Sequence, residues 1–347
     1  MSCGKFIKGY REYHCKNPTC THVKYVTQSC NSRFCPTCGK RATDQWIIKQ
    51  QETLPKCDWQ HITFTIPKQL WYFLKQQPDL LNEYAKQAAN SIQKMAKKKG
   101  IQVGIFIAIH TFGRDLQWHP HIHLSVTMGG LCEKSQQWRN LRFSKKAIMP
   151  IWKYNIITMI RKAMKSGKIS CSNKLLNEQY NKYWIVHFAK PTESPFRTIS
   201  YLGRYLKRPP ISMSRLFHYD GKSVAFNYLN HRIKKHQNIS IEMDHFIYLF
   251  TQHIPKKGFR LIRYYGFLAN RIKNKILPKI YKLLEQTVNL KKFMTWKASH
   301  LKEFGEDPLK CILCSSRMVF IRAHHGMPHR EIVKHHKALA LRQIINL

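Results

Sequence analysis

The sequence predicts an α+β protein built around an antiparallel sheet, and three observations support this fold class. Residues 1–57 form a cysteine-rich, turn-rich segment that closes with a helical pattern. Residues 58–253 contain stretches in which apolar and polar side chains alternate, as in strands, between longer stretches of helical periodicity. Residues 254–347 are basic and mainly helical in pattern. We therefore expect three domains with these boundaries.

The predicted sheet begins directly after the cysteine-rich segment. The run "WQHITFTIP" alternates apolar and polar side chains and stops at Pro67, and a helical stretch follows from about Gln69 to Lys99. The run "VGIFIAIHTFGRDLQWHPHIHLSVTMGG" predicts two strands joined through "GRDLQ", the second ending at Gly129 and Gly130. Strands joined by so short a connection are antiparallel neighbours.

Helices and short strands are expected in the rest of the chain. Residues 144–182 are rich in Trp, Lys and Ile and mainly helical in pattern. The run "YWIVHFAKP" predicts a further strand, and "TISYLGRYLKRPP" predicts a short helix that ends at Pro209 and Pro210. Beyond Met213, "SVAFNYL" is strand-like, "MDHFIYLFTQHI" is helical, and basic helices continue to the end.

The charge of the chain indicates a nucleic-acid partner. Sixty Lys and Arg residues stand against eighteen Asp and Glu, a formal net charge of +42 that is spread over all three predicted domains. Charge alone does not separate an enzyme from a packaging protein of similar composition. The sequence has no signal-peptide core and no run of about 18 apolar residues, so we expect a cytoplasmic protein without a membrane partner.

The cysteine-rich segment predicts a structural zinc site. Eleven cysteines, an odd number, favour metal ligation over disulfides in a reducing cytoplasm. Zinc held by four thiolates would fold a segment that has little core of its own. Cys30 is an alternative ligand, as are His14 and His22. The preferred ligands are Cys15, Cys20, Cys35 and Cys38.

Other residues near these cysteines, and a second cysteine pair, carry further predictions. Basic side chains inside the segment suit contact with DNA, namely Arg33, Lys40 and Arg41. Cys311 and Cys314 precede three histidines, and two cysteines alone are a weaker signal for a second metal site. The remaining cysteines are expected to be ordinary buried thiols: Cys3, Cys57, Cys132 and Cys171.

Three histidines at alternate positions of one predicted strand indicate a second kind of metal site. Side chains alternate faces along a strand, so His119, His121 and His123 share one face while apolar side chains occupy the other. Imidazoles two residues apart can lean toward one ion from this rigid platform. His110, on the preceding strand, would complete the site or be a core histidine, and His61 is a weaker candidate. The alternative is a solvated polar strand face.

A pair of tyrosines supplies a candidate nucleophile. Tyr201 and Tyr205 are four residues apart, so they share one face of the predicted helix, together with basic side chains. A phenol is a poor nucleophile at neutral pH unless cations stabilise its anion. Attack on a phosphodiester would form a phosphotyrosine and release a 3′ hydroxyl. The alternative is a tyrosine pair that packs a basic helix on its neighbour. The basic side chains, which also suit DNA contact, are Arg204, Lys207 and Arg208.

In combination, these segments resemble the rolling-circle insertion-sequence transposases of the HUH endonuclease superfamily, in the group numbered ninety-one. The matching segments are "SCNSRFCPTC", "HITFTIP", "HTFGRDLQWHPHIHLSVTMGG", "YLGRYLKRPPIS" and "RYYGFLAN", in the order found in the family. The resemblance implies a central antiparallel sheet flanked by helices, with the metal site on a central strand facing the tyrosine helix. The family's N-terminal zinc-binding domain matches the cysteine-rich segment, although "CKNPTC" has a longer cysteine spacing than expected.

The resemblance also implies a mechanism. His121 and His123 would be the metal-binding pair, and the ion would be Mg²⁺ or Mn²⁺. The third ligand stays open, with His110 and His119 as the candidates from the strand pattern. Tyr201 and Tyr205 would attack single-stranded or hairpin DNA at the ends of the element. We therefore expect a transposase that acts at the nucleoid of a bacterial-type cell. The alternatives are a replication initiator or relaxase with the same chemistry, and a non-catalytic zinc-dependent nucleic-acid binder.

Overall fold

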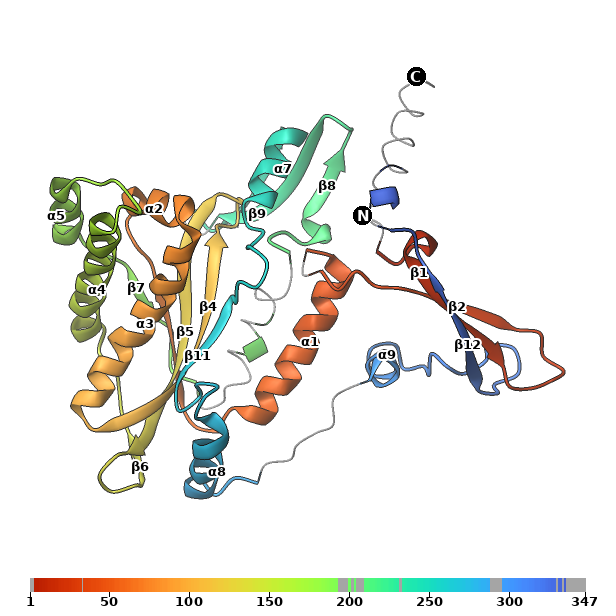
Figure 1. Ribbon diagram of the computed structural model, residues 1–347, viewed down its shortest axis with the longest axis horizontal. Helices are drawn as coiled ribbons and strands as arrows, with labels where there is room; N and C mark the ends of the chain where they lie inside the picture. The colour runs from red at the N-terminus through yellow and green to blue at the C-terminus, as the bar shows by residue number, and fades with distance from the viewer. Residues whose placement is uncertain are drawn as a thin grey trace. The chain divides into compact units, whose positions relative to one another are not determined.

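The computed structural model divides into two compact units (Figure 1). The terminal unit combines Met1–Gln45 with Leu290–Leu347, and the central unit is Trp46–Asn289. Both ends of the chain thus contribute to one unit. The structure describes residues 3–32, 34–192, 199, 200, 203, 209–230, 233–287, 295–328, 330–332 and 334.

An antiparallel sheet forms the middle of the central unit, which confirms the α+β fold class. Its strands lie in the order β11-β4-β5-β3-β7, and β6 pairs with β5 outside that row. All of these pairings are antiparallel. The bounds are β3 Trp59–Phe64, β4 Ile101–Phe112, β5 Trp118–Cys132, β6 Trp138–Asn140, β7 Val186–Phe188 and β11 Ile262–Gly266.

One face of this sheet packs against helices α3 and α4 (Figure 1). Helix α3, Pro78–Lys98, begins with a proline at its first turn, where the missing amide costs nothing, and buries one apolar stripe. Helix α4 spans Lys145–Lys165 and buries Trp152, whose indole Nε1 donates a hydrogen bond to the Thr65 carbonyl at 2.9 Å. Alternate residues of the sheet complete this core, among them Ile107, Ile109, Ile122, Leu124 and Val126.

A second buried cluster lies on the opposite face of the same sheet. Phe106 and Ala108 of β4 belong to it, together with Ile199. The far end of helix α1, Pro36–Thr53, and helix α8, Lys273–Leu283, add Trp46, Leu277 and Ile280. The sheet is therefore covered on both faces along part of its length, and residues of even number in β4 face this second cluster.

A small antiparallel sheet extends the central unit near the turn between β4 and β5. Its strands lie in the order β10-β9-β8, and helix α7, Met243–Thr251, packs on it. Leu116 in the β4–β5 turn is fully buried in the same cluster as Phe226 of β9. The bounds are β8 Leu216–Tyr219, β9 Ser223–Asn230 and β10 Lys235–Glu242; other helices of the unit are α2 Trp71–Gln76 and α5 Asn173–Asn181.

The terminal unit contains a three-stranded antiparallel sheet in the order β12-β1-β2. Gly9 starts β1 with φ of +92°, and a Cβ there would lie 2.4 Å from the His324 carbonyl oxygen, so the position requires glycine. The bounds are β1 Gly9–Cys15, β2 Val23–Thr27 and β12 Met318–His325, with a short 3-10 helix η1 at Phe6–Lys8 and helix α9 at Trp296–Phe304.

The structure joins segments that we expected to lie in different domains. Residues 254–347 do not form one separate region, because β11 hydrogen-bonds to β4 in the central unit while β12 hydrogen-bonds to β1 in the terminal unit. Helix α1 begins in one unit and ends in the other, so residue 57 is not a boundary between the units. Strand pairing between distant segments leaves no mark in local sequence patterns.

A charged cluster ties β1 to β12. Glu12 is only 6% exposed, and its carboxylate accepts hydrogen bonds from Arg322 Nε and His324 Nε2, each at 2.8 Å. His14 Nε2 lies 2.6 Å from the other carboxylate oxygen. The hydrogen bonds from Arg322, His324 and His14 lower the pKa of Glu12 from 4.5 to about 2. The folded unit therefore favours the ionised carboxylate.

The depressed pKa of Glu12 predicts a pH-dependent contribution to stability. The contribution is complete above the unfolded pKa near 4.5 and is lost as the pH falls from there toward 2. Amide hydrogen exchange of residues 9–15 and 318–325 should show faster opening in Glu12→Gln than in the wild type at pH 6, and a smaller difference at pH 3. Glu306→Gln, at an exposed position of the same unit, is the matched control. A difference that stays constant to pH 3 would contradict the prediction.

Candidate active site and metal centres

Three histidines of the central sheet form one cluster. Candidate ligand atoms of His110, His121 and His123 all lie within 4.8 Å of one another. His121 and His123 are two residues apart on β5 and therefore share a face, and His110 lies directly opposite His121 on β4. The strand register thus brings three imidazoles together on the face opposite α3 and α4.

Hydrogen bonds orient the rings of this cluster. His121 Nδ1 donates to the His119 carbonyl oxygen at 2.8 Å, which leaves Nε2 of His121 available as a ligand. His123 Nδ1 lies 3.1 Å from His61 Nε2, and His61 Nδ1 lies 3.1 Å from Ser125 Oγ. If His123 binds an ion through Nε2, this chain carries its Nδ1 proton toward His61. His61 thus supports His123 from β3.

Burial favours the neutral form of the His61, His121 and His123 imidazoles. It lowers the pKa of His121 to about 4, and it lowers the pKa of His61 to about 4, with a smaller effect from His187. Burial, followed by the neighbouring His110, lowers the pKa of His123 well below 6.5. Neutral imidazole is the form that binds metal ions. Three imidazole nitrogen donors fit Mn²⁺ better than Mg²⁺, which prefers oxygen ligands.

A cavity of about 650 Å³ opens at the histidine cluster. Its wall includes Arg114 from the β4–β5 turn and Arg215 before β8. Arg215 Nε donates to the Asn227 carbonyl at 2.7 Å, and Nη2 donates to the Arg114 carbonyl at 2.6 Å. The wall therefore combines a candidate metal site with guanidinium groups that suit phosphate.

The other residues predicted for this site are only partly described. His119 is not a member of the cluster, and its ring lies 4.7 Å from the ring of Trp71. Ile199, two positions before Tyr201, is fully buried in the cluster that contains Phe106 and Ala108 of β4. The predicted nucleophiles Tyr201 and Tyr205, and the predicted DNA contacts Arg33, Arg204, Lys207 and Arg208, lie outside the described residues.

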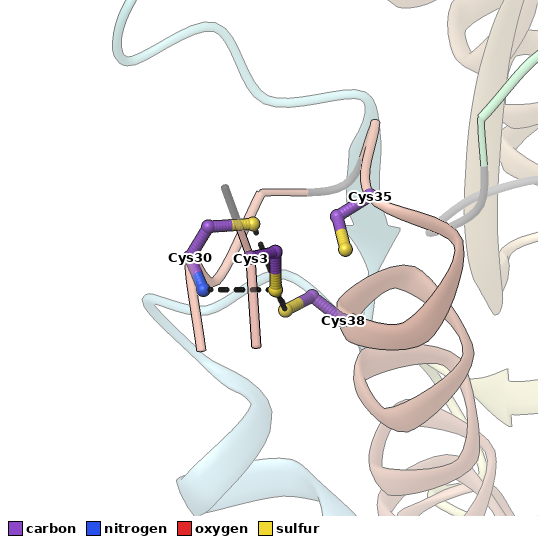
Figure 2. Close-up of side chains that lie close together, drawn as sticks. All are labelled: Cys3, Cys30, Cys35 and Cys38. Carbon is purple, nitrogen blue, oxygen red and sulfur yellow. Dashed lines mark hydrogen bonds between the residues drawn. The ribbon is translucent and has the colours of Figure 1, made fainter. Parts of the chain in front are cut away.

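Four cysteines of the terminal unit gather at the start of α1 (Figure 2). Cys3 Sγ and Cys30 Sγ lie 3.6 and 3.7 Å from Cys38 Sγ, and the Cys30 amide donates to Cys3 Sγ. Cys35 completes the group. Zn–S bonds of about 2.3 Å in a tetrahedron place sulfurs about 3.8 Å apart, so these spacings fit a four-thiolate zinc site.

A second group of four cysteines lies at one end of the three-stranded sheet. Cys15 Sγ lies 3.3 Å from Cys314 Sγ, and Cys20 Sγ lies 3.7 Å from Cys311 Sγ. Hydrogen bonds from the hydroxyl and amide of Ser316 lower the pKa of Cys314 to about 6, whereas burial raises the pKa of Cys15 to about 12.

The structure therefore does not bring the four preferred zinc ligands together. It separates Cys15 and Cys20 from Cys35 and Cys38, and it gives each pair two partners from elsewhere in the chain. Cys30, the predicted alternative, and Cys3, expected to be an ordinary thiol, complete the first group. No spacing pattern in the sequence connects Cys3 with the other cysteines of this group.

Strand register explains the composition of the second group. Cys15 pairs with Met318 at one end of β1, whereas Gly9 pairs with His325 at the other end. Cys311 and Cys314 therefore reach Cys15, whereas His324 and His325 lie at the opposite end of the sheet. His22 Nδ1 lies 3.2 Å from Cys311 Sγ, as a neighbour of the group.

Two predicted DNA contacts on helix α1 are described. Lys40 and Arg41 are exposed in the first half of the helix. Lys40 Nζ forms a 3.5 Å ion pair with Asp44 one turn later, which is an exposed pair of small energetic weight. The lysine thus remains accessible to a phosphate.

Comparisons with known proteins match two segments of the chain to transposase families. Residues 1–66 match the family described as transposase zinc-binding domain, and residues 104–275 match the family described as putative transposase. The match to the zinc-binding family and the cysteine groups together support Zn²⁺ as a cofactor. No solved structure matches the chain. Within the described residues, no helix is both long and apolar enough to cross a bilayer.

Two curated relatives cover most of the chain. The transposase for insertion sequence element IS801 of Pseudomonas savastanoi pv. phaseolicola is 41% identical over 340 residues, which span 94% of this chain and 83% of the relative. The putative transposase y4qJ of Sinorhizobium fredii is 28% identical over 290 residues, 78% of this chain and 73% of the relative. The two cysteine groups match the zinc-binding family, and the relatives are named as transposases. The chain belongs to the family of insertion-sequence transposases with an N-terminal zinc-binding domain that includes the IS801 transposase.

Proposed function

We propose that this transposase is a metal-dependent tyrosine nuclease and strand transferase that acts on single-stranded or hairpin DNA at the ends of its own element, at the nucleoid of a bacterial-type cell. The observation that carries the proposal is the cluster of His110, His121 and His123 in a cavity walled by two arginines. The cluster offers an ion three imidazole donors and leaves space beside them for a phosphodiester.

The histidine cluster would hold Mn²⁺ or Mg²⁺. When bound, the ion would supply positive charge that polarises the scissile phosphate. His61 would hold the ring of His123 in position through the Nδ1 contact, and Arg114 and Arg215 would attract the flanking phosphates. The geometry favours His110 over His119 as the third ligand.

The proposed nucleophile is the hydroxyl of Tyr201 or Tyr205. Its oxygen would form a bond to phosphorus as the bond from phosphorus to the 3′ oxygen breaks, which leaves a 5′-phosphotyrosine and a 3′ hydroxyl. The second tyrosine would serve the second cleavage or the transfer back. Burial of Ile199 in the cluster on the His110 face of β4 supports a position of this segment on the metal side of the sheet.

The proposed chemistry predicts a covalent adduct. Wild-type protein incubated with Mn²⁺ and single-stranded DNA from the ends of its element should run as a protein–DNA conjugate on a denaturing gel. Tyr201→Phe combined with Tyr205→Phe should abolish the conjugate, and His121→Ala should reduce it by about 100-fold or more because the ligand set is broken. Tyr154→Phe, at an exposed tyrosine of α4, is the matched control.

Two results of this assay would overturn the proposal. Absence of a conjugate in the wild type would favour a transposase without this nuclease step. A conjugate that persists in the double tyrosine variant would assign the nucleophile to another residue. Mass spectrometry of the conjugated peptide would then name it.

We also propose that the terminal unit binds two zinc ions, one in each group of four cysteines. Purified protein should contain two zinc ions per chain by elemental analysis. Cys3→Ser and Cys311→Ser should each reduce the content to about one, because each removes one of four thiolates. Cys57→Ser, at a cysteine outside both groups, should retain two. Full zinc content in Cys3→Ser would show that Cys3 is not a ligand.

A further inference from the structure

We propose that one face of the three-stranded sheet in the terminal unit binds unpaired bases of single-stranded DNA by stacking. The proposal rests on the proposed function in one respect, namely that the DNA is single-stranded. The site is a group of rings, called here the aromatic face, in which Phe6 and Tyr25 are exposed and Tyr10 and His324 are half-buried.

Strand register places these rings on one side of the sheet. Tyr10 on β1 lies opposite His324 on β12, and their rings are stacked at 4.3 Å between centroids. Tyr25 on β2 lies opposite Glu12, which is two residues from Tyr10 and therefore on the same face. The rings of Tyr10 and Tyr25 meet edge to face at 5.2 Å. Three strands thus contribute to a continuous row.

Phe6 extends the row from the short helix before β1. Its ring lies 5.0 Å from the Tyr10 ring and 6.0 Å from the Tyr25 ring, in edge-to-face contact with both. Phe6 is 57% exposed and Tyr25 is 49% exposed. The apolar cluster of the unit contains Tyr13 and Met318 instead, and Tyr13 points to the opposite face of β1. The aromatic face therefore leaves ring surface open to solvent.

The terminal unit is basic, which suits binding of a phosphate backbone. The terminal unit contains nineteen Lys and Arg against six Asp and Glu. Arg322 lies on this face opposite Glu12, its Nε is fixed by the carboxylate, and 66% of its side chain is exposed. The carboxylate itself is buried beneath the cation. A strand of DNA would thus meet an oriented guanidinium beside open rings.

This combination favours single-stranded DNA over a duplex. Aromatic side chains stack on bases of any sequence, and adjacent cations hold the backbone. In a duplex each base is already stacked and paired, so its faces are closed to a protein ring. A ring at Phe6 or Tyr25 therefore has a partner only in unpaired DNA.

Binding by the full chain tests the proposal with two fluorescent probes. One is an oligothymidylate, and the other is an abasic strand of the same length, which has the phosphates without the bases. Phe6→Leu combined with Tyr25→Leu removes the rings while keeping apolar bulk. This variant should bind oligothymidylate about 5- to 100-fold more weakly than the wild type and bind the abasic strand equally well. Its zinc content should match the wild type.

Phe320→Leu is the matched control. Phe320 is 50% exposed on β12, and its ring contacts Tyr13 on the opposite face of the sheet. This variant should bind both probes as the wild type does. Equal binding of oligothymidylate by the wild type and the double variant would overturn the proposal, as would equal losses for both probes. Loss of adduct formation in the wild type would refute the nuclease and leave this binding test unaffected.

A crosslinking experiment on the wild-type protein tests the same site without relying on variants that could misfold. Oligothymidylate that contains 5-iodouracil crosslinks under ultraviolet light to aromatic side chains in contact with the base. The crosslinked peptides should include Phe6, Tyr10 or Tyr25. Crosslinks confined to peptides of the central unit would refute the aromatic face as a binding site.

Discussion

The antiparallel pairing of β4 with β5 is the interaction on which the central unit depends. Because side chains alternate along both strands, one register serves two purposes at once. It directs Ile107, Ile109 and Ile122 into the core under α3 and α4, and it directs His110 and His121 to the other face. A slip of one residue would place the imidazoles in the core and expose the isoleucines, so hydrophobic burial fixes the position of the polar cluster.

The three-stranded sheet of the terminal unit is also antiparallel, but it has little apolar core to stabilise it. A segment with little apolar core gains stability from metal–thiolate bonds and from a buried carboxylate with several partners. Glu12 holds β12 against β1 in the middle of the ladder, and the cysteine group holds the two strands at one end. The apolar cluster here is small, with Tyr13, Cys311 and Met318 as its buried members.

Features that repeat within a strand could be predicted from the sequence, and features that join distant strands could not. The shared face of His121 and His123 follows from a period of two, and the antiparallel hairpin follows from its short connection. The cysteine groups of the structure differ from the predicted ligand set, because β1 pairs with β12 and so brings Cys311 and Cys314 to Cys15. His61 as a support for His123 depends likewise on the register between β3 and β5. The tyrosine pair stays a prediction, since it lies outside the described residues.

The closure of the second cysteine group by both ends of the chain has a consequence for biosynthesis. Cys15 and Cys20 leave the ribosome first, and Cys311 is added 291 residues after Cys20, which takes roughly 15 to 60 s at ordinary translation rates. Until then two thiols of the group have no partners from the other end. A gene copy with a premature stop codon before that point would yield a product that lacks half of this group. All four thiols of this group are therefore present only after translation has passed Cys314.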